Sequence, residues 1–331
     1  MNSHPTSAQD IDPLADTATG PLARLQSPDA VVRRIALLEL ADLEIPDAVP
    51  AFMAALRGDA AAEIRAEAAA ILGAWERDDV VDALCAALLD QDDEVRDAAA
   101  DSLAGLQQPS SGAVLRRWVQ QPAPAVLRAV LRGLRELRYA EALEPALDAL
   151  AHDDAAVRLE AVSVLGWLRD ERALAPLIGR VVGDVDPVVR RTAVGALGFA
   201  PSGDEATVHA LLAALRDDAW RVREETAETL GKLRAQKAVE PLVAALDDPY
   251  WQVRLRALRA LGQLRDARAA LPVAALLTHT IGNLRREAAL TLGELRDART
   301  LQALRNALLD QDPDVRKAVR IALTQMGDEQ R

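Results

Sequence analysis

The sequence of 331 residues is poor in cysteine, histidine and aromatic side chains. It has one cysteine and four histidines, and aromatic residues make up 3% of it. A single cysteine cannot form a disulfide within the chain, and this usage is typical of a reducing compartment, so we expect a cytoplasmic protein. Cys85 lies in the apolar stretch 80–89 with no base nearby, which indicates a small core residue rather than a nucleophile.

Long apolar runs are also missing. No stretch approaches the roughly 18 apolar residues that a membrane-spanning helix requires. Residues 1–20 include three aspartates and two prolines but no apolar run of the kind found in signal peptides. We expect residues 1–20 to form a flexible N-terminal tail and residues 328–331 a short C-terminal tail.

Positive charge is the minority charge. The 51 acidic residues outnumber the 39 basic ones, which gives a formal net charge of −12. An acidic chain repels phosphate backbones, so nucleic-acid binding is the least favoured of the functions we consider. It requires Arg256, Arg259 and Arg286 to dominate their local surface.

The usual signatures of catalysis and metal binding are absent from the sequence. There is no Gly-rich phosphate loop, no nucleophile elbow and no His-Glu dyad. Asp310, Asp312 and Asp314 have the first spacings of a calcium-binding EF-hand loop. The required glycine is replaced by Val315, however, and no glutamate closes the loop. We therefore expect a protein without cofactor or metal, and these absences favour a binding protein over an enzyme.

What the sequence does contain is a repeat. An arginine recurs about every 31 residues, and self-similarity at a fixed period of this size is typical of stacked-repeat proteins. We number each repeat from its arginine as position 0. The ten arginines are Arg33, Arg65, Arg96, Arg128, Arg158, Arg190, Arg223, Arg254, Arg285 and Arg316.

The residues around position 0 predict a helix. Position −1 is aliphatic in all ten repeats, position +3 is alanine in seven, and position +7 is leucine in nine, so that one helical face is apolar. A proline-containing segment before it, such as 142–145 or 173–176, predicts a second helix. Aspartates at position −4 are expected to cap the helix that contains the arginine. These are Asp29, Asp92, Asp154, Asp186 and Asp312.

Each repeat is therefore predicted to be an antiparallel helix pair, with helix A first and helix B containing position 0. Because one pair cannot bury its apolar face alone, we expect about ten of them to stack. The prediction is an all-α fold, a right-handed α-solenoid, formed by one domain over residues 21–327. Repeat 4 lacks its capping aspartate and has Arg135 in place of the leucine at +7, so we place a possible hinge near 105–138.

The segments 90–96 and 184–190 follow the pattern Asp-x-Asp-x-x-Val-Arg. With the Ala and Leu-Gly positions that come after it, this pattern resembles the HEAT repeat, in the bacterial variety named after phycobilisome lyases. The resemblance implies that helix B lines the concave face of a solenoid and binds ligands. It says little about which ligand, because repeat scaffolds serve many functions.

The arginine series itself is interpreted as structural. Aspartates at position −6 lie before helix B, where an arginine fork of the adjacent repeat can pair with them. We therefore predict a ladder of Arg–carboxylate pairs rather than a phosphate-binding stripe. It includes Arg65, Arg96, Arg158, Arg190, Arg223, Arg254, Arg285 and Arg316.

Partner-binding residues are predicted at positions −3, −2, +1, +2, +5 and +9 of helix B, which lie off the apolar face. Three zones follow one another there. Repeats 2 and 3 are acidic, with Glu63, Glu67, Asp93, Asp97 and Asp101. Repeats 4 to 6 are mostly apolar, with Val126 and Val130 among them, and repeats 8 to 10 mix acidic and basic residues, including Arg256 and Arg259. Four of the nine aromatic residues fall on these positions: Trp167, Phe199, Trp220 and Trp251.

The function predicted from these features is a non-catalytic scaffold, adaptor or assembly factor that binds a protein partner. Exposed aromatic and arginine side chains are common interface anchors. The alternative is a subunit of a chromophore or cofactor lyase, which the family resemblance implies. In that case the aromatic residues hold a tetrapyrrole-like ligand next to its acceptor protein.

Overall fold

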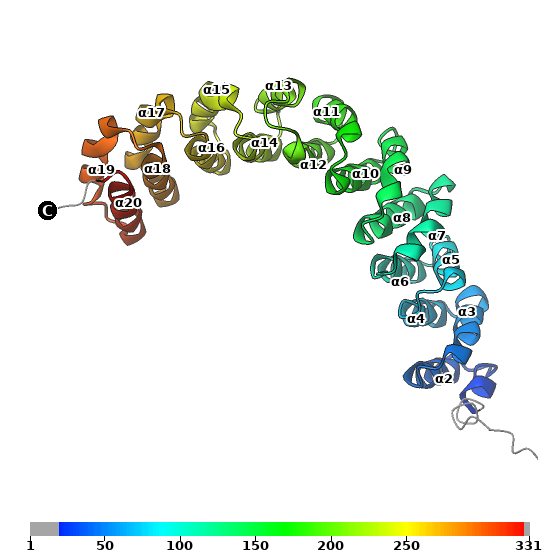
Figure 1. The fold of residues 1–331 in the computed structure, drawn as a ribbon. Helices are drawn as coiled ribbons and strands as arrows, with labels where there is room; N and C mark the ends of the chain where they lie inside the picture. Colours follow the sequence, from blue (N-terminus) through cyan, green and yellow to red (C-terminus); the bar gives the residue numbers. More distant parts are fainter. Residues whose placement is uncertain (1–19, 328–331) are drawn as a thin grey trace, which may run out of the picture. The chain divides into compact units, whose positions relative to one another are not determined.

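A computed structural model describes residues 20–327, and within that range the chain forms helices and loops without a strand. Of the two predicted tails, only Gly20 belongs to this range, and the other tail residues lie outside it. No helix in the described range is long and apolar enough to cross a membrane. Figure 1 shows the helices following one another in pairs, as predicted for an α-solenoid.

The arginine series lies in ten helices, which are the predicted B helices. The arginine is the fourth or fifth residue of its helix in every case. The B helices are α2 (Ala30–Asp42), α4 (Ala62–Leu72), α6 (Asp93–Ala104), α8 (Pro124–Glu136), α10 (Ala155–Leu168), α12 (Pro187–Ala196), α14 (Trp220–Lys232), α16 (Trp251–Leu264), α18 (Gly282–Leu295) and α20 (Pro313–Gln325).

Shorter A helices alternate with them: α3 (Val49–Gly58), α5 (Asp78–Ala87), α7 (Pro109–Arg117), α9 (Leu143–Ala149), α11 (Leu174–Gly183), α13 (Glu205–Ala214), α15 (Val239–Ala244), α17 (Ala270–Ala275) and α19 (Leu301–Ala307). Single 3-10 turns flank many of them. Six precede an A helix, at Pro46–Ala48, Ala140–Ala142, Glu171–Ala173, Gln236–Ala238, Ala267–Ala269 and Ala298–Thr300. Four follow a helix, at Trp118–Gln120, Leu197–Phe199, Ala245–Asp247 and Leu276–Thr278.

The predicted caps of the B helices are confirmed. All five aspartates at position −4 accept a hydrogen bond from a backbone N–H in the first turn, as Asp154 does from Ala156 and Val157. A side-chain acceptor at this position contributes about 1 kcal/mol to a helix. Helices α14, α16 and α18 have Ala219, Tyr250 and Ile281 at the capping position instead, and the side chains of these residues accept no such bond.

The B helices form the core of each stack. The predicted apolar face is buried, for example at Val157, Ala161 and Leu165, which have no exposed surface. Neighbouring B helices also approach closely at glycines. A Cβ at Gly293 would lie 2.9 Å from the Cα of Ala322, and one at Gly231 would lie 2.9 Å from the Cα of Ala260. Both glycines are at position +8 of their repeats, eight residues after the arginine, and they allow neighbouring B helices to pack closely there.

The ends of several B helices have an unusual backbone. A left-handed residue at this place is normally glycine, because a Cβ costs roughly 1–2 kcal/mol there. Here arginines occupy it, with φ of 50° to 56°, and Glu44 follows α2 in the same conformation. The arginines are Arg138, Arg169, Arg234, Arg265 and Arg296.

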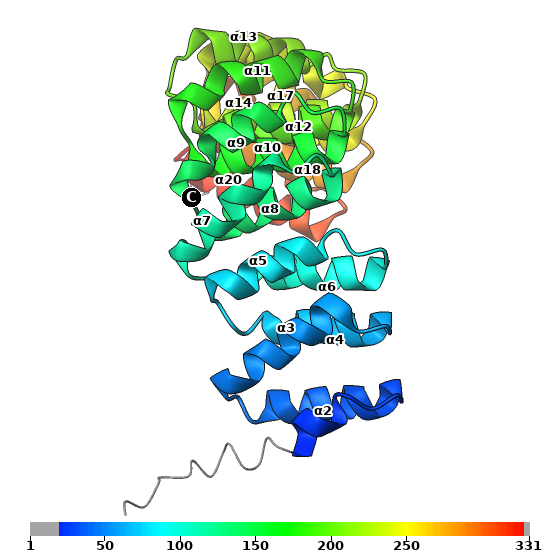
Figure 2. The same cartoon turned by 90° about the vertical axis from the view of Figure 1, so that its right-hand side faces the viewer.

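The chain divides into two compact units, residues 1–145 and 146–331. We call them unit 1, described from residue 20, and unit 2, described to residue 327. In unit 1, α3 packs against α4 and α5 against α6, as Figure 2 shows. In unit 2, α14, α16 and α18 pack side by side (Figure 1). The single domain over 21–327 and the hinge near 105–138 stay predictions.

Candidate partner-binding surfaces

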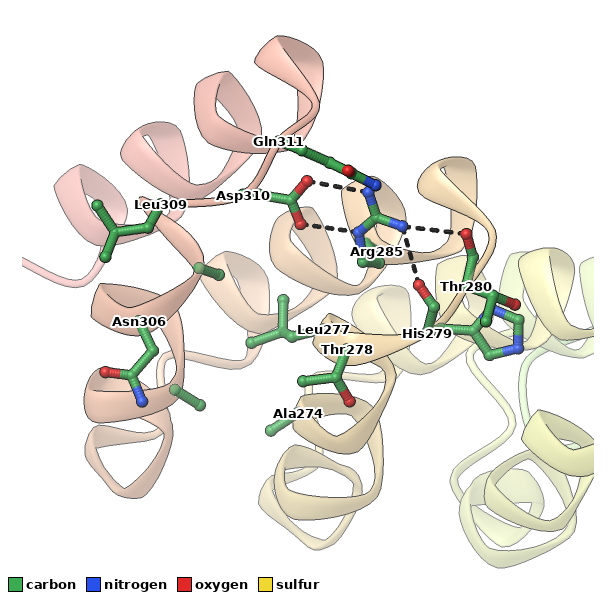
Figure 3. A pocket seen from close by; sticks show the side chains of 12 residues that line it. Ala274, Leu277, Thr278, His279, Thr280, Arg285, Asn306, Leu309, Asp310 and Gln311 are labelled. Atoms are coloured by element: carbon green, nitrogen blue, oxygen red, sulfur yellow. Dashed lines mark hydrogen bonds and ion pairs between the residues drawn. The ribbon is translucent and has the colours of Figure 1, made fainter.

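The position-0 arginines link neighbouring repeats. Nε and Nη2 of the arginine donate to both carboxylate oxygens of an aspartate at position −6 of the following repeat, at 2.6 to 3.0 Å. Nη1 donates to the carbonyl at position −6 of its own repeat. Figure 3 shows this arrangement for Arg285 and Asp310. The pairs are Arg33–Asp59, Arg65–Asp90, Arg158–Asp184, Arg190–Asp217, Arg223–Asp248 and Arg285–Asp310.

Each of these aspartates also organises its own loop. One carboxylate oxygen accepts the backbone N–H two residues later, as Asp184 does from Asp186 at 3.0 Å. The Asp184 side chain is fully buried. Burial alone raises the pKa of Asp184, but the hydrogen bonds from Arg158 and Asp186 outweigh it and the pKa is lowered. The carboxylate is thus an ionised structural bridge, and the paired arginine is not free for a ligand.

We call each pair of a position-0 arginine and the position −6 residue of the next repeat a rung of the ladder. In one rung of unit 2, the position −6 residue is a histidine instead of an aspartate. The His279 Nδ1 accepts the N–H of Ile281 at 3.0 Å, and its Nε2 faces Nη1 of Arg254 at 3.1 Å. A neutral imidazole has only one acceptor nitrogen, so it cannot accept from both. The Arg254 Nε is buried without an acceptor. Burial, followed by the charges of Arg254 and Arg285, lowers the pKa of His279.

Two other predicted rungs differ as well. In unit 1, Pro122 occupies the position that would offer a carboxylate to Arg96, and Arg96 pairs with Asp93 in its own helix instead. In unit 2, Arg316 donates to the carbonyls of Asp310 and Gln311, at 2.7 and 3.0 Å. Asp310 belongs to the ladder, and Asp312 caps α20 by accepting the backbone N–H of Asp314. No described group of three or more His, Cys, Asp or Glu residues could hold a metal ion.

Three aromatic residues cluster at the start of two adjacent B helices in unit 2. The rings of Trp220 and Tyr250 stack with centroids 5.2 Å apart and planes 11° from parallel. Trp251 follows Tyr250, and these two side chains are 37% and 45% exposed. The Arg221 guanidinium lies 5.1 Å from the Trp220 ring. We call Trp220, Tyr250 and Trp251 the aromatic cluster.

Sequence reasoning missed Tyr250 in this cluster. Tyr250 is at position −4, which is a capping aspartate in other repeats, and an aromatic residue at a cap position was the available signal. The other two predicted aromatic residues lie elsewhere in unit 2. Trp167 is 41% exposed at the end of α10, and Phe199 is half-buried in the turn after α12. A cavity of about 490 Å³ lies at α10 and α12 and is lined mainly by small residues, including Ser163, Gly166, Thr192 and Gly195, whereas Trp167 is not part of its lining.

Position +2 is exposed in repeat 1, where Ile35 is 47% exposed, but it is buried or half-buried in the other nine repeats. Val130 of repeat 4 has no exposed surface, and Glu287 of repeat 9 is 8% exposed. Val126, one turn before Val130 at position −2, is buried too, and the prediction of an exposed apolar zone is wrong for both valines. The ion pairs explain this difference, because a residue at +2 faces positions +1 and +5 of the preceding B helix. Glu67, for example, pairs with Arg34 of repeat 1.

Arg256 and Arg259 belong to the same pattern. Arg256 pairs with Glu228 at 2.8 Å and lies 3.6 Å from Glu224, and Arg259 pairs with Glu287 at 3.1 Å. These arginines therefore connect neighbouring B helices of unit 2. Their positive charge is largely compensated within the unit.

The predicted acidic zone lies in unit 1. Glu63, Asp97 and Asp101 are exposed and form no ion pair with a described residue. Asp93 is exposed but pairs with Arg96, and Glu67 is half-buried. Cys85 is buried in α5, and burial raises the pKa of its thiol, as is typical of a structural cysteine in a core.

Stacked helix pairs joined by this ladder define an α-helical repeat protein of the solenoid class. The HEAT-repeat family matches the chain in overlapping segments, at residues 19–104, 49–130, 113–198, 180–261 and 239–324. Because these segments cover nearly the whole sequence, the chain belongs to the HEAT-repeat family. No protein of curated function matches the sequence.

Solved structures share the fold at low sequence identity. An engineered protein is 19% identical with a TM-score of 0.53, and the match covers 94% of this chain and 98% of that one. The Escherichia coli protein YibA is 18% identical with a TM-score of 0.60, over 82% and 98% of the two chains. The karyopherin Kap121p is 14% identical with a TM-score of 0.60 over 95% of this chain, which spans only 41% of the karyopherin. These similarities establish the fold alone.

Proposed function

We propose that this protein is a non-catalytic scaffold, adaptor or assembly factor that binds a protein partner on the B helices of unit 2. The observation that supports this is the aromatic cluster. In a chain with 3% aromatic residues, three of them lie together at the surface, two of them more than one-third exposed. Aromatic side chains lose little conformational entropy on binding and are frequent anchors of interfaces.

The fold similarity supports a protein as the ligand. Kap121p has been solved with the extreme C-terminus of the protein phosphatase Cdc14p and with Pho4p. A solenoid of this architecture thus holds partner polypeptides. We further propose that the exposed acidic residues Glu63, Asp97 and Asp101 of unit 1 steer a basic region of the partner, because complementary charge accelerates association. The site of action that we propose is the cytoplasm.

The test is capture of a partner from a lysate of the source organism. The full chain should retain one protein in stoichiometric amount, and the double variant Trp220→Ala plus Trp251→Ala should retain little of it. The matched control is Leu309→Ala, which removes an 89% exposed apolar side chain outside the cluster. If the double variant has native circular dichroism and captures the partner normally, the site is wrong. If the wild-type protein captures nothing in stoichiometric amount, the function is wrong.

A tetrapyrrole-binding lyase subunit, of the kind that phycobilisome-lyase-type repeats suggest, is the second candidate. The cavity of about 490 Å³ lined by Ser163, Gly166 and Gly195 is the observation in its favour. Titration of the pure protein with a tetrapyrrole should then shift the absorbance of the pigment, and Gly195→Trp, which fills the cavity, should abolish the shift. An unchanged spectrum at saturating pigment rejects this candidate.

A further inference from the structure

Three consecutive B helices of unit 2 end at arginines with strained backbones. Arg234, Arg265 and Arg296 have φ of 50°, 53° and 51°. All three side chains are exposed, and none forms a hydrogen bond or ion pair with a described residue. We call these three residues the basic edge.

The packing of the B helices places these arginines in a row. The C-terminal half of each helix contacts the C-terminal half of the next. A Cβ at Gly231 of α14 would touch Ala260 of α16, and one at Gly262 of α16 would touch Thr291 of α18. The helices therefore run in the same direction and end at the same edge. Successive arginines are one repeat apart, on the order of 8–10 Å, which is the usual distance between packed helices.

The backbone at this position favours a different residue. Glycine adopts positive φ without a steric penalty, and it is the common residue after a helix. Arginine occupies the position in three consecutive repeats although its side chain forms no bond within the protein. A cation near a helix C-terminus does interact favourably with the helix dipole. That effect is the competing explanation, and a stability measurement can separate the two.

Other cations in the same loops are already paired. Lys237 pairs with Glu205, Arg268 with Glu240 and Asp266, and Arg299 with Asp297. Their charges are compensated locally. In these loops, the three arginines of the basic edge are the cations without an acidic partner, and they are therefore available to bind an external anion.

We propose that the basic edge binds an extended acidic segment of a protein partner, with one carboxylate for each arginine. In the extended polyproline II conformation every third side chain lies on the same face of the peptide, and successive ones are about 9 Å apart, which matches the repeat. The net charge of −12 disfavours a long polyphosphate chain, because the protein as a whole repels a highly charged polyanion more strongly than a short peptide with three carboxylates. The basic edge lies at the ends of α14 and α16, whereas the aromatic cluster lies at their beginnings, so the two surfaces are separate.

The test uses the full chain and a fluorescent peptide with glutamate at every third position. The triple variant Arg234→Gly, Arg265→Gly and Arg296→Gly should bind this peptide about tenfold more weakly, as expected for the loss of three exposed ion pairs. Its Tm should be unchanged or higher, because glycine relieves the backbone strain. The control variant Arg132→Gln, Lys317→Gln and Arg320→Gln removes the same charge from other exposed, unpaired positions and should bind normally.

Three results would overturn the proposal. A lower Tm of the glycine variant would assign the arginines to helix stability. Equal peptide binding by the glycine variant, or an equal loss in the control variant, would remove the site. Tighter binding of a single-stranded oligonucleotide of the same charge would make nucleic acid the occupant. The variant Trp220→Ala plus Trp251→Ala should bind the peptide normally, so failure of the aromatic site can be distinguished from failure of this one.

Discussion

Unit 1 and unit 2 use their position-0 arginines in different ways. In unit 1, Arg33 and Arg65 hold aspartates of the next repeat, but Arg96 turns back to Asp93 because Pro122 offers no carboxylate. In unit 2, four arginines hold such aspartates, at Arg158, Arg190, Arg223 and Arg285. A regularly spaced arginine therefore joins two neighbouring repeats only where the loop of the following repeat supplies a carboxylate as the acceptor.

The exposed charges of the two units differ in the same sense. In unit 2, Arg256 and Arg259 compensate glutamates on neighbouring B helices. In unit 1, Glu63, Asp97 and Asp101 have no such partner among the described residues. Charge alone therefore does not identify a binding surface in this protein. Whether the charge is already paired between repeats is the more useful criterion, and it directs attention to the aromatic cluster and the basic edge.

Acidification should have the largest effect, and it should affect unit 2 more. Hydrogen bonds from the paired arginines lower the pKa of Asp59 and Asp90 in unit 1. In unit 2 the pKa values of Asp184, Asp217 and Asp310 are lowered as well. A lowered pKa contributes stability that is present above the unfolded value of about 3.9 and lost as the pH falls through the folded value.

Hydrogen exchange followed by mass spectrometry at decreasing pH, corrected for the intrinsic exchange rate, measures this loss for each unit separately. Protection in unit 2 should decrease more between about pH 4 and pH 2, where carboxylates protonate. An equal decrease in both units would contradict the ladder as the source of the difference.

Removal of one buried rung should have the next largest effect. Arg158→Ala leaves the fully buried carboxylate of Asp184 without its bidentate partner, and Arg180, 3.5 Å away, compensates only in part. Loss of one partner of a buried pair costs about 3–5 kcal/mol, so we expect a value of about 3 kcal/mol in urea unfolding. The matched variant in unit 1 is Arg96→Ala, whose partner Asp93 is 86% exposed. It should lose less than about 1 kcal/mol, and equal losses would refute the distinction.

A methyl group between the B helices of unit 2 should be less damaging. In Gly293→Ala the new Cβ would lie 2.9 Å from the backbone of Ala322, which cannot rotate away. Overpacking of this kind costs about 1–3 kcal/mol. Gly105→Ala in unit 1 is the control, because the nearest atom would be 3.5 Å away. Thermal unfolding should show a lower Tm only for the first variant, and an equal decrease in both would show that the stacks are equally tight.

The His279 rung should give the smallest change, in the opposite direction. His279→Asp supplies acceptors for both Ile281 and Arg254, and we expect a gain of about 1 kcal/mol, typical of one net hydrogen bond to a charged group. His209→Asp, on the exposed part of α13, is the control and should not change stability.

The same variant should alter the pH dependence. The unfolded chain protonates His279 near pH 6.5, whereas burial and the charges of Arg254 and Arg285 lower the folded pKa. The wild-type protein should therefore lose stability as the pH falls from about 7 through 6.5. His279→Asp should remove that slope, and persistence of the slope would show that another group causes it.

The sequence predicted the helix pairs, the caps and the core face, because these depend on local spacing. Asp154 and Val157, for example, need only the geometry of their own helix. The register of neighbouring repeats was harder to predict. Position +2 was expected to be exposed, but its burial at Val130 and Glu287 depends on where the preceding B helix lies. No spacing within a single repeat contains that information.

Two features of the candidate sites depend on contacts between repeats and on backbone conformation, which the spacing of residues in the sequence does not show. Tyr250 joins the aromatic cluster because it stacks on Trp220 of the preceding repeat. The basic edge exists because the helix ends at Arg234, Arg265 and Arg296 adopt positive φ. The recurrence of these arginines 11 residues after position 0 was visible in the sequence. Their backbone conformation and their lack of a partner were not.

The central claim is that the position-0 arginines stabilise the fold whereas the aromatic cluster binds the partner. The most direct test measures partner capture by two variants in parallel. Arg158→Ala and the double variant Trp220→Ala plus Trp251→Ala are compared at a temperature where circular dichroism shows both to be folded. We predict that the arginine variant, although less stable, captures the partner as the wild-type protein does, and that the tryptophan variant captures little. Normal capture by the tryptophan variant together with lost capture by folded Arg158→Ala would contradict the account.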